Sequence, residues 1–577
     1  MNGPATLDLV SLSDAAHLDA VLRCWTREQG IPVTVEGIFV PVPGTDLNVS
    51  AQCTHLSRTG LHSFSGVAVV QPDGVRHEVS AEGLLALLTT GADPQERALL
   101  LARTRESVRN VTEFAARDWV ASPGEDLFLD GERSLLLGHL QHPAPKSRDD
   151  LSPAELVAYS PELTGRFQIH WFEAHHSVVR NDQAADSRSL GGRDLPEVLA
   201  EIAGQSASPG YVLIPAHPWQ AKAVLQRPAV KELVDGGLLR PLGPLGEEWW
   251  ATSSLRTLFH PGHAVMLKLS LGLKITNSVR EATATELRRG VEVNRLIDAG
   301  YITHDPGFSI VLDPAWAAVI DPSDPSGETL TGLDVSVREV PEGVGRLVCL
   351  AGLIAPTSPA VPVSSSGTGE TPAQGVPGWG PSLLARWCDD PGAWLAGYID
   401  KVLIPMVGLY ARTGVGLEGH QQNTLVRLGA HGEIIGGAYR DNQGYYLATS
   451  HLGDVLATTG ESTSALAVVE DAIVDDRLTY YLLHNQALSL VGAMAAENMA
   501  DEDVLLRIVR ERLSAALPDL AEAGPAGVRL VERWLNAPTL PCKAHLATRL
   551  AGIDEVVAPL DAQSVYLDIP NPLVGVA

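Results

Sequence analysis

The chain has 577 residues, a net charge of -27 and 45% hydrophobic residues. This length is enough for several domain-sized cores, and a charged content of 19% is ordinary for a globular protein. The acidic balance argues against a nucleic-acid partner or an anionic membrane surface, because the long-range field repels both. No apolar run approaches the roughly 18 to 20 residues of a membrane span, so we expect no membrane association.

The N-terminal segment and the cysteines indicate a cytoplasmic protein. No basic n-region followed by an apolar h-region is present, so the sequence predicts no secretory signal. The cysteines are odd in number and lack CxxC spacing, which argues against a disulfide framework or a zinc knuckle. They are Cys24, Cys53, Cys349, Cys388 and Cys542.

The first part of the chain mixes predicted helices and strands. Asp93 before Pro94, with Glu96 three residues after the Asp, predicts the start of a helix that continues with apolar spacing to Ala115. Residues 356–381 are rich in Pro, Gly, Ser and Thr, which predicts a mobile loop or linker. Helical stretches are expected near residues 391–413 and throughout most of the chain after about residue 460.

Residues 265–276 alternate apolar and polar side chains, which predicts one half-buried strand. Lys268 and Thr276 would lie about 26 Å apart on a straight strand, so a shared site requires a bend, which Gly272 permits. Asn277 or Ser278 is then expected to cap a helix with Arg280 in its first turn.

The wider stretch 254–280 contains no acidic residue in a strongly acidic chain. This predicts a pocket for an anion. The alternative is a solvated strand face that pairs with surface acids elsewhere. The basic residues and histidines of the stretch are Arg256, Lys268, Lys274, Arg280, His260 and His263.

Three shorter clusters add polar groups suited to an anion. Ser254, Arg256 and Thr257 offer two hydroxyls and a guanidinium, which match phosphate oxygens. His142 lies in the Pro-punctuated segment GHLQHPAPKSRDD, and His217 precedes Pro218 at the end of a predicted strand. A single His before Pro is usually structural, so each cluster alone is weak evidence.

Residues 416–444 read as a hairpin with two strand-like runs joined by a Gly-flanked turn. Glu418, His420 and Gln422 are expected to alternate onto one strand face, and the turn near residues 429–432 should bring Asp441 back toward Asn423. The alternative is that these polar groups satisfy one another on an exposed hairpin.

Taken in order, these clusters resemble the IucA/IucC family of siderophore synthetases that act without a nonribosomal peptide synthetase. The pattern is GHxxHPxxKxR, hPxHPWQ, SxRT, KLxLxxxITNSxR, ExHxQN and RD, over about residues 135 to 445. The resemblance implies an α+β fold like a cupped hand, with a palm distantly similar to protein kinases. It implies a thumb at 1–130, fingers at 131–355, the flexible loop at 356–381 and the palm at 382–577.

The resemblance also implies an activity and a set of site residues. The family members are AMP-forming ligases that use ATP and Mg²⁺ to adenylate a carboxylate, which an amine or hydroxyl then attacks. Ser254, Arg256, Thr257 and Lys268 match positions that hold ATP phosphates, with His142 as a helper. Thr276, Arg280 and His420 match the positions that hold the carboxylate, and His420 is also a candidate base. The nucleotide and metal positions match Gln422, Asn423 and Asp441, with Glu418 at the same edge.

The substrate and partners are expectations of the same kind. The segment KITNSVREATATELRRGVEVNRL resembles the branch of the family that uses free citrate. The nucleophile stays open among amines and alcohols, and the resemblance favours a homodimer. Two alternatives are a synthetase or macrocyclase acting on hydroxamate-bearing succinyl or citryl intermediates, and a non-catalytic protein that binds citrate or nucleotide.

Overall fold

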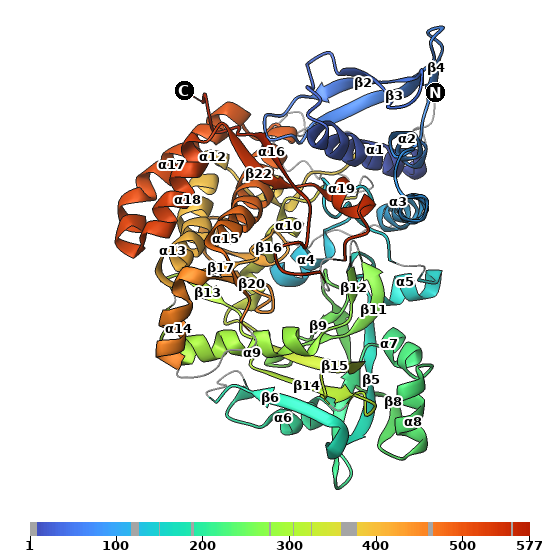
Figure 1. Cartoon of the computed structure of the whole chain (residues 1–577), viewed down its shortest axis with the longest axis vertical. Coiled ribbons are helices and arrows are strands. Elements are labelled where there is room, and N and C mark those ends of the chain that lie inside the picture. Colours follow the sequence, from blue (N-terminus) through green and yellow to red (C-terminus); the bar gives the residue numbers. More distant parts are fainter. Residues whose placement is uncertain are drawn as a thin grey trace.

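The computed structural model describes most of the chain, and its elements form three regions (Figure 1). The described residues are 8–116, 126–148, 151–185, 190–275, 278–303, 305–324, 326–358, 378–459, 466–554 and 558–576. Most of the segment 356–381, predicted as a mobile loop, lies outside them, as does Thr276.

The N-terminal region combines a four-stranded antiparallel sheet, β1-β2-β3-β4, with three helices that pack on one another, of which α1 contacts β3. Its core joins α1, α2 and the sheet through Val21, Leu22, Val49 and Leu84. The predicted helix after Asp93 is present, and the Asp93 carboxylate caps it by accepting from the backbone N–H groups of Gln95 and Glu96. The elements are α1 (Leu9–Glu28), β1 (Ile38–Pro41), β2 (Asn48–His55), β3 (Ser63–Val70), β4 (Arg76–Glu78), α2 (Ala81–Leu88) and α3 (Pro94–Ala115).

The middle region is built on an eight-stranded antiparallel sheet in the order β6-β14-β15-β10-β9-β8-β5-β7. Its strands are β5 (Arg166–His175), β6 (Val179–Gln183), β7 (Tyr211–Ala216), β8 (Leu239–Ala251), β9 (Thr257–Phe259), β10 (Val265–Leu269), β14 (Ala315–Ile320) and β15 (Leu330–Glu339). Its helices are α4 (Leu127–Arg133), α5 (Pro153–Tyr159), α6 (Leu195–Ala203), α7 (Pro218–Val224), α8 (Pro228–Asp235) and α9 (Ala284–Asp298). A core that includes Trp171, Phe172 and Trp249 fills this region.

The single strand predicted over residues 265–276 is wrong. The chain leaves the large sheet at Ser270, and β11 (Leu271–Ile275) pairs instead with β12 (Ser278–Arg280) in a separate two-stranded sheet. The Ser270 hydroxyl donates to Asp334 at 2.8 Å and accepts from the Ala282 N–H at 2.8 Å, which fixes the break. Every residue of β10 is buried, Lys268 included, so the period-2 pattern does not mark an exposed face there.

The helix predicted from Asn277 or Ser278 is also wrong in its start. Thr283 caps α9 in a capping box with Glu286, and this local signal outweighs the Asn-Ser pair. Arg280 therefore ends strand β12 and is not part of a helix.

The C-terminal region is largely helical, as predicted, around a third core that includes Tyr398, Tyr410 and Trp534. Its strands are β13 (Phe308–Ile310), β16 (Leu347–Cys349), β17 (Val415–Leu417), β18 (Thr424–Leu428), β19 (Ile434–Tyr439), β20 (Tyr445–Ala448), β21 (Val468–Val469), β22 (Thr539–Lys543) and β23 (Tyr566–Pro570). Its helices are α10 (Leu350–Leu353), α11 (Leu383–Trp387), α12 (Pro391–Tyr398), η5 (Ile399–Leu403), α13 (Ile404–Thr413), α14 (Leu452–Thr459), α15 (Asp471–Leu478), η7 (Thr479–Leu488), α16 (Ser489–Ala496), α17 (Glu502–Ala523), α18 (Pro525–Asn536) and α19 (His545–Leu550).

One continuous helix, Pro391–Thr413, is long and apolar enough by length and composition to cross a membrane, so the expectation that no apolar run approaches this length is wrong. Just over half of its apolar window, 56%, is buried inside the protein. Its charged residues are also used within the fold: Asp400 binds Arg512, and Lys401 donates to the Ile434 carbonyl. We interpret it as a core helix.

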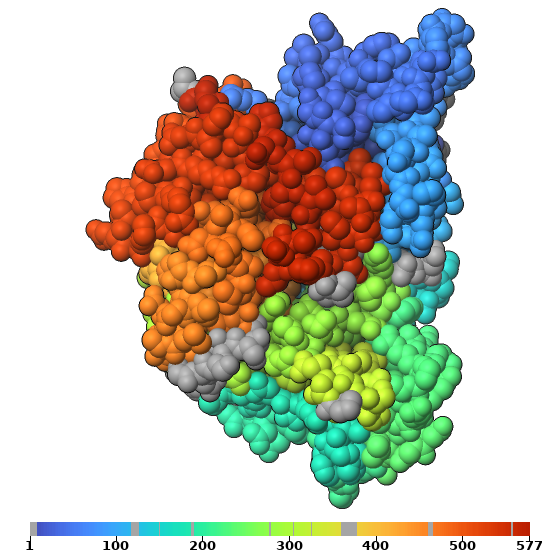
Figure 2. Space-filling view, in the orientation of Figure 1, coloured from blue at the N-terminus to red at the C-terminus, as the bar shows by residue number. Residues whose placement is uncertain are grey.

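The end of the chain joins the other two regions. Helix α19 packs against α1 and α3, and the Glu28 carboxylate of α1 accepts from the backbone N–H groups of Leu546 and Ala547, both at 2.8 Å. Figure 2 shows the red C-terminal segment against both the blue N-terminal region and the green middle region. Residues near the C-terminal end of the described chain therefore form part of the wall of the cleft between the regions, with Lys543 and His545 in its lining.

Candidate functional site

A cavity of about 310 Å³ lies where the three regions meet. Its lining comes from the loop after α4, from the turn before β9, from β9 to β12, from β15, from the turns that precede β18 and follow β19, from η7 and from the β22–α19 junction. The chemically important members are His139, His142, Lys146, Arg148, Ser254, Arg256, Thr257, Lys268, Arg280, Arg338, Glu418, His420, Gln422, Asn423, Arg440, Asp441, Tyr480, Tyr481, Asn485, Lys543 and His545. The acids of this lining are Glu418 and Asp441, so cations dominate it within a strongly acidic protein.

The hairpin predicted over residues 416–444 is present as β18 and β19, joined at residues 429–433. Its open end brings the ends of the motif together, since the Arg440 N–H donates to the Asn423 carbonyl at 2.9 Å. The expected alternation of Glu418, His420 and Gln422 on one strand face is wrong. These residues form a turn between β17 and β18, in which the Asn423 N–H donates to the His420 carbonyl at 2.9 Å.

The segment Ser254 to Thr257 forms a tight turn before β9. The Ser254 hydroxyl accepts from the Thr257 N–H at 3.1 Å, and Leu255 between them has a φ of 64°. A buried non-glycine residue in the left-handed region is unusual, and such residues gather at functional sites. The turn directs Arg256 into the cavity, where its guanidinium donates to the Arg280 carbonyl at 3.0 Å.

Lys268 connects the strands to the hairpin. Its ammonium binds the Asp441 carboxylate and donates to Gln443 at 2.6 Å. Arg338 reaches the same Asp441 oxygen at 3.2 Å while it also pairs with buried Asp313 at 2.7 Å. Burial alone would raise the pKa of the Asp441 carboxyl, but Lys268 and Arg338 outweigh it and hold that pKa well below its ordinary range.

Asp441 has a φ of 87°, so it is, after Leu255, a second non-glycine residue of the cavity lining with a left-handed backbone. This strained residue carries the carboxylate that binds Lys268 and Arg338. Burial lowers the pKa of the Lys268 ammonium, against the attraction of Asp441. Lys268 is only 5% exposed. The Asp441 carboxylate compensates the charge of this buried ammonium. The ion pair therefore keeps a positive charge at the place where an anionic ligand would bind.

A second buried network joins the turn at residues 253–257 to the hairpin. Glu132 of α4 accepts from the Ser253 N–H at 2.8 Å and pairs with Arg440 at 2.7 Å. Gln422 donates to the Ser253 hydroxyl at 3.1 Å, and Arg440 donates to the Gln422 carbonyl at 2.8 Å. The two motifs are thus held in a fixed relation before any ligand binds.

The two cavity histidines expected to act are oriented by backbone hydrogen bonds, with His142 buried and His420 half-buried. Burial lowers the pKa of His420 to about 4, and Lys543 and Arg280 add to this effect while Asp441 opposes it. His420 is therefore neutral at pH 7. Its Nδ1 accepts from the Asn423 N–H at 3.3 Å, which leaves the proton on Nε2. His142 is fixed in the same way by the Ala144 N–H at 3.1 Å.

All the predicted site residues that the structure describes line this one cavity. They are His142, Ser254, Arg256, Thr257, Lys268, Arg280, Glu418, His420, Gln422, Asn423 and Asp441. Thr276 lies outside the described residues. Lys274, His260, His263 and His217 are not in the lining. His217 packs between Tyr159 and Phe167, where burial lowers its pKa to about 3, so it is a core residue.

Sequence reasoning missed several lining residues. Arg338 gave no signal, because its partner Asp313 lies 25 residues earlier in the sequence, outside strand β15. Tyr480, Tyr481 and Asn485 come from η7, a π-helical segment, and such segments are frequent at functional sites. Tyr481 donates to the Glu418 carboxylate, and Asn485 accepts from the Gln421 N–H at 2.9 Å. Lys543 and His545 lie in the late segment PTLPCKAHLATRL.

A divalent cation can be tested against this donor set. Asp441 and Glu418 supply carboxylates, and Asn423 and Gln422 supply amide oxygens, which are ligands that Mg²⁺ accepts. All four line the same cavity. The residues fit such an ion, provided that the Asp441 carboxylate exchanges part of its contact with Lys268 for it.

Comparison with known proteins gives a consistent result. The IucA / IucC family matches residues 127–355, and the ferric iron reductase FhuF-like transporter family matches residues 392–557. The rhizobactin siderophore biosynthesis protein RhbC of Rhizobium meliloti (strain 1021) is 34% identical over 92% of this chain and 91% of its own length. The spermidine-citrate ligase of Bacillus anthracis is 30% identical over 98% of both chains.

The fold has a matching solved structure. The ATP-bound aerobactin synthetase IucA from a hypervirulent pathotype of Klebsiella pneumoniae superposes with a TM-score of 0.78 at 24% identity, over 98% of this chain and 100% of that one. The likeness confirms the mixed α+β fold predicted from the sequence. The thumb, fingers and palm divisions and the kinase-like palm stay predictions.

Proposed function

The chain belongs to the IucA/IucC family, and on that premise we propose that it is an ATP-dependent ligase of siderophore biosynthesis that joins citrate to an amine or hydroxyl nucleophile. The observation that carries the proposal is the convergence of Arg256, Lys268 and Arg280 on one cavity with His420 and Asp441. We further propose that the enzyme is cytoplasmic and acts as a homodimer.

Charge explains why such a cavity suits this reaction. A triphosphate and a citrate repel each other, so a site that brings them within bonding distance must cancel several negative charges beforehand. In this protein the cancelling groups are guanidinium and ammonium groups on strands and tight turns, with Arg256 and Lys268 buried and Arg280 half-buried. A preorganised site of this kind avoids the cost of reorganising water around the charges during the reaction.

The proposed reaction has two steps. A citrate carboxylate oxygen attacks the α-phosphorus of ATP, the bond to the β-phosphate oxygen breaks, and pyrophosphate leaves. The nucleophile then attacks the acyl carbon, its proton is lost, and AMP departs with the bonding electrons. Ser254, Arg256, Thr257 and Lys268, with His142, hold the triphosphate in this proposal, and Gln422, Asn423 and Asp441 hold the rest of the nucleotide.

Citrate is the preferred acid because it carries two carboxylates besides the reacting one. We assign Arg280, Thr276 and His420 to those two groups, since charge-assisted hydrogen bonds give both affinity and orientation. The name of the Bacillus anthracis relative, a spermidine-citrate ligase, supports this choice. Mg²⁺ would be held by Asp441 with Asn423, Gln422 and Glu418, and when bound it would supply charge neutralisation for the phosphates.

His420 has two chemically distinct roles open to it. A proton on Nε2, which the contact at Nδ1 favours, makes His420 a hydrogen-bond donor to a substrate carboxylate. The role of base toward the nucleophile requires the other tautomer. The geometry therefore favours the donor role, and the two roles predict different kinetics.

The test is pyrophosphate release by the full-length protein with ATP, Mg²⁺ and citrate, with hydroxylamine as a surrogate nucleophile. Citrate-dependent release with formation of a citryl hydroxamate is the expected result. Turnover only with a preformed citryl or succinyl intermediate would replace citrate by that intermediate as the substrate. Tight binding of ATP or citrate without turnover, with every amine and alcohol tried, would overturn the ligase proposal in favour of a binding protein.

A further inference from the structure

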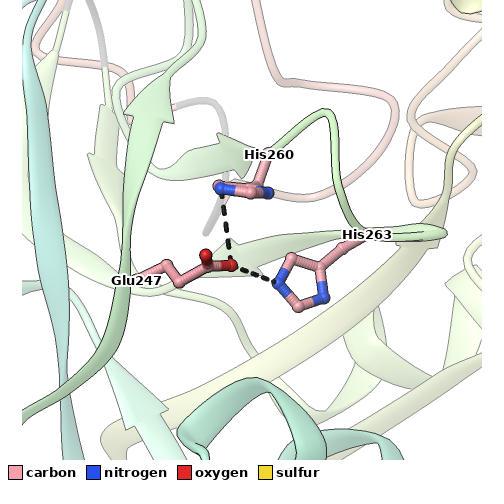
Figure 3. Close-up of side chains that lie close together, drawn as sticks. All are labelled: Glu247, His260 and His263. Carbon is pink, nitrogen blue, oxygen red and sulfur yellow. Dashed lines mark hydrogen bonds and ion pairs between the residues drawn. The ribbon is translucent and has the colours of Figure 1, made fainter.

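A group of potential metal ligands lies away from the cavity, on the middle region (Figure 3). Glu247 projects from β8, His260 directly follows β9, and His263 lies two residues before β10. Figure 3 shows both imidazole rings directed toward the Glu247 carboxylate. In the part of the chain that the structure describes, this is the cluster of three such side chains whose ligand atoms all lie within 4.8 Å of one another.

The distances in this cluster match a small tetrahedral ion. The Nε2 atoms of His260 and His263 lie 3.6 and 3.3 Å from the same Oε2 atom of Glu247. Zinc binds imidazole nitrogen and carboxylate oxygen at about 2.0 to 2.2 Å, so the ligand atoms of a tetrahedral site are roughly 3.3 to 3.5 Å apart. The two nitrogen–oxygen distances are therefore close to those of a tetrahedral site, and the three ligand atoms all lie within 4.8 Å of one another.

The surroundings orient the imidazoles and leave a path to solvent. The indole of Trp249 stacks on His263, with ring centroids 4.9 Å apart and an interplanar angle of 21°, and Trp250 lies beside His260 at 5.5 Å. Both histidine side chains are 15% exposed, whereas Glu247 is 67% exposed. The rings are thus held by packing, and water can complete the coordination from the carboxylate side.

The neighbouring acid has a different partner. Glu248 pairs with Arg166 at 3.1 Å, while the ion pairs of Glu247 are with the two histidines. Among the residues that the structure describes, the carboxylate of Glu247 forms its ion pairs with two imidazoles and with no Arg or Lys, which makes it a suitable anionic ligand for a cation. Glu248 supplies a natural control because it is the adjacent exposed glutamate of the same strand.

One contact must change when an ion binds. The Gly262 N–H donates to Nδ1 of His260 at 3.0 Å, which places the proton of the neutral ring on Nε2. Coordination through Nε2 shifts that proton to Nδ1 and gives up this hydrogen bond, at a cost equivalent to about a tenfold loss of affinity. Gly262 is exposed in the turn between the two histidines, so the turn has room to adjust.

We propose that Glu247, His260 and His263 bind a late first-row divalent transition ion, with Zn²⁺ as the representative. Two imidazole nitrogens and one carboxylate oxygen suit zinc and its neighbours, whereas Mg²⁺ and Ca²⁺ prefer oxygen ligands alone. The bound ion would tie β8 to the β9–β10 turn. The other end of that hairpin carries Thr257 and Lys268 of the cavity. This inference does not depend on the proposed function.

The experiment is a competition titration of the chelator-treated full-length protein with Zn²⁺ against a chromophoric zinc indicator. Wild type is expected to take up one equivalent that Mg²⁺ in large excess does not displace. Glu247→Gln should weaken that uptake by at least about tenfold, and Glu248→Gln should leave it unchanged. Substitution by Co²⁺ should give the intense visible absorption of a tetrahedral site, which the double variant His260→Ala/His263→Ala should lack.

Two results would overturn the proposal. One is equal zinc uptake by Glu247→Gln and Glu248→Gln, which would place any bound zinc elsewhere. The other is an absence of tight uptake in wild type. Far-UV circular dichroism and thermal unfolding serve as checks that each variant is folded.

Discussion

The two sides of the cavity are built from different materials. The strand side, with Arg256, Lys268, Arg280 and Arg338, comes from strands and the tight turn before β9 and supplies cations. The hairpin side, with Glu418, His420, Gln422, Asn423 and Asp441, comes largely from turns and supplies amides, an imidazole and the two acids. The sides meet at the ion pair between Lys268 and Asp441.

This division has a physical logic. Fixed cations are most effective when they cannot move away from the charge they stabilise, and buried strands are the stiffest parts of the fold. Neutral donors and carboxylates must instead match the shape of a particular acid, which turns can vary at little cost. We therefore expect changes on the strand side to affect the reaction with any substrate, and changes on the hairpin side to alter the use of citrate more selectively.

The largest effect is expected for Lys268→Met. Removal of this ammonium leaves Arg338 as the ion-pair partner of Asp441 and takes one fixed positive charge from the proposed triphosphate site, so citrate-dependent pyrophosphate release should fall about 10³-fold. The matched control is Lys274→Met, in the same run of sequence but outside the cavity, which should retain nearly full activity. Equal losses in both variants would mean that the strand side has no special role.

A smaller and more selective effect is expected for His420→Ala. Loss of a hydrogen-bond donor to a substrate carboxylate should raise the KM for citrate by roughly 10- to 100-fold, with adenylation and transfer slowed together. His431→Ala, at the exposed turn of the same hairpin, should change neither. If adenylation is intact and only transfer to the nucleophile is slow, His420 acts as the base instead.

The smallest effect concerns Asp334, which lies behind the strand side and accepts from Ser270. Burial raises the pKa of its carboxyl from 3.8 to about 7. The folded protein therefore binds a proton that the unfolded chain releases between these values, so this contribution to stability is present below about pH 4 and is lost as the pH rises through about 7.

Thermal unfolding between pH 5 and pH 8.5 tests this sign. The Tm of wild type should fall with rising pH more than that of Asp334→Asn, in which the titrating group is gone. Asp235→Asn, at an exposed helix end, should follow wild type. Parallel curves for wild type and Asp334→Asn would contradict the shift.

Much of the site could be predicted from the sequence, because many of its polar residues lie close together in short motifs. Ser254, Arg256 and Thr257 are neighbours in the chain, and the Gly-flanked turn of the hairpin predicted that Asp441 returns to Asn423, as the pairing of Thr424 with Tyr439 confirms. The assignment of roles to these residues stays a prediction. The motifs predicted which residues line the cavity.

The rest depended on contacts that are not local. Alternation over residues 265–276 could not reveal that Ser270 binds Asp334 and directs the chain into a second sheet. No sequence pattern marks Arg338, because its ion-pair partner Asp313 lies before β14 and not near Arg338 in the chain. The start of α9 was misread although Thr283 and Glu286 form a recognisable capping box, so this error was one of choosing between two local signals.

The junction of β22 and α19 has a consequence for the making of the protein. Lys543 and His545 complete the cavity lining, and Glu28, from the first helix, holds the start of α19 by two backbone hydrogen bonds. During translation, a chain that has not yet passed residue 550 lacks Lys543 and His545 of the cavity lining. It also lacks helix α19, to which Glu28 of the first helix is hydrogen-bonded. Competence for ligand capture should therefore arise only after residues 543–550 have been synthesised and have folded against the first helix.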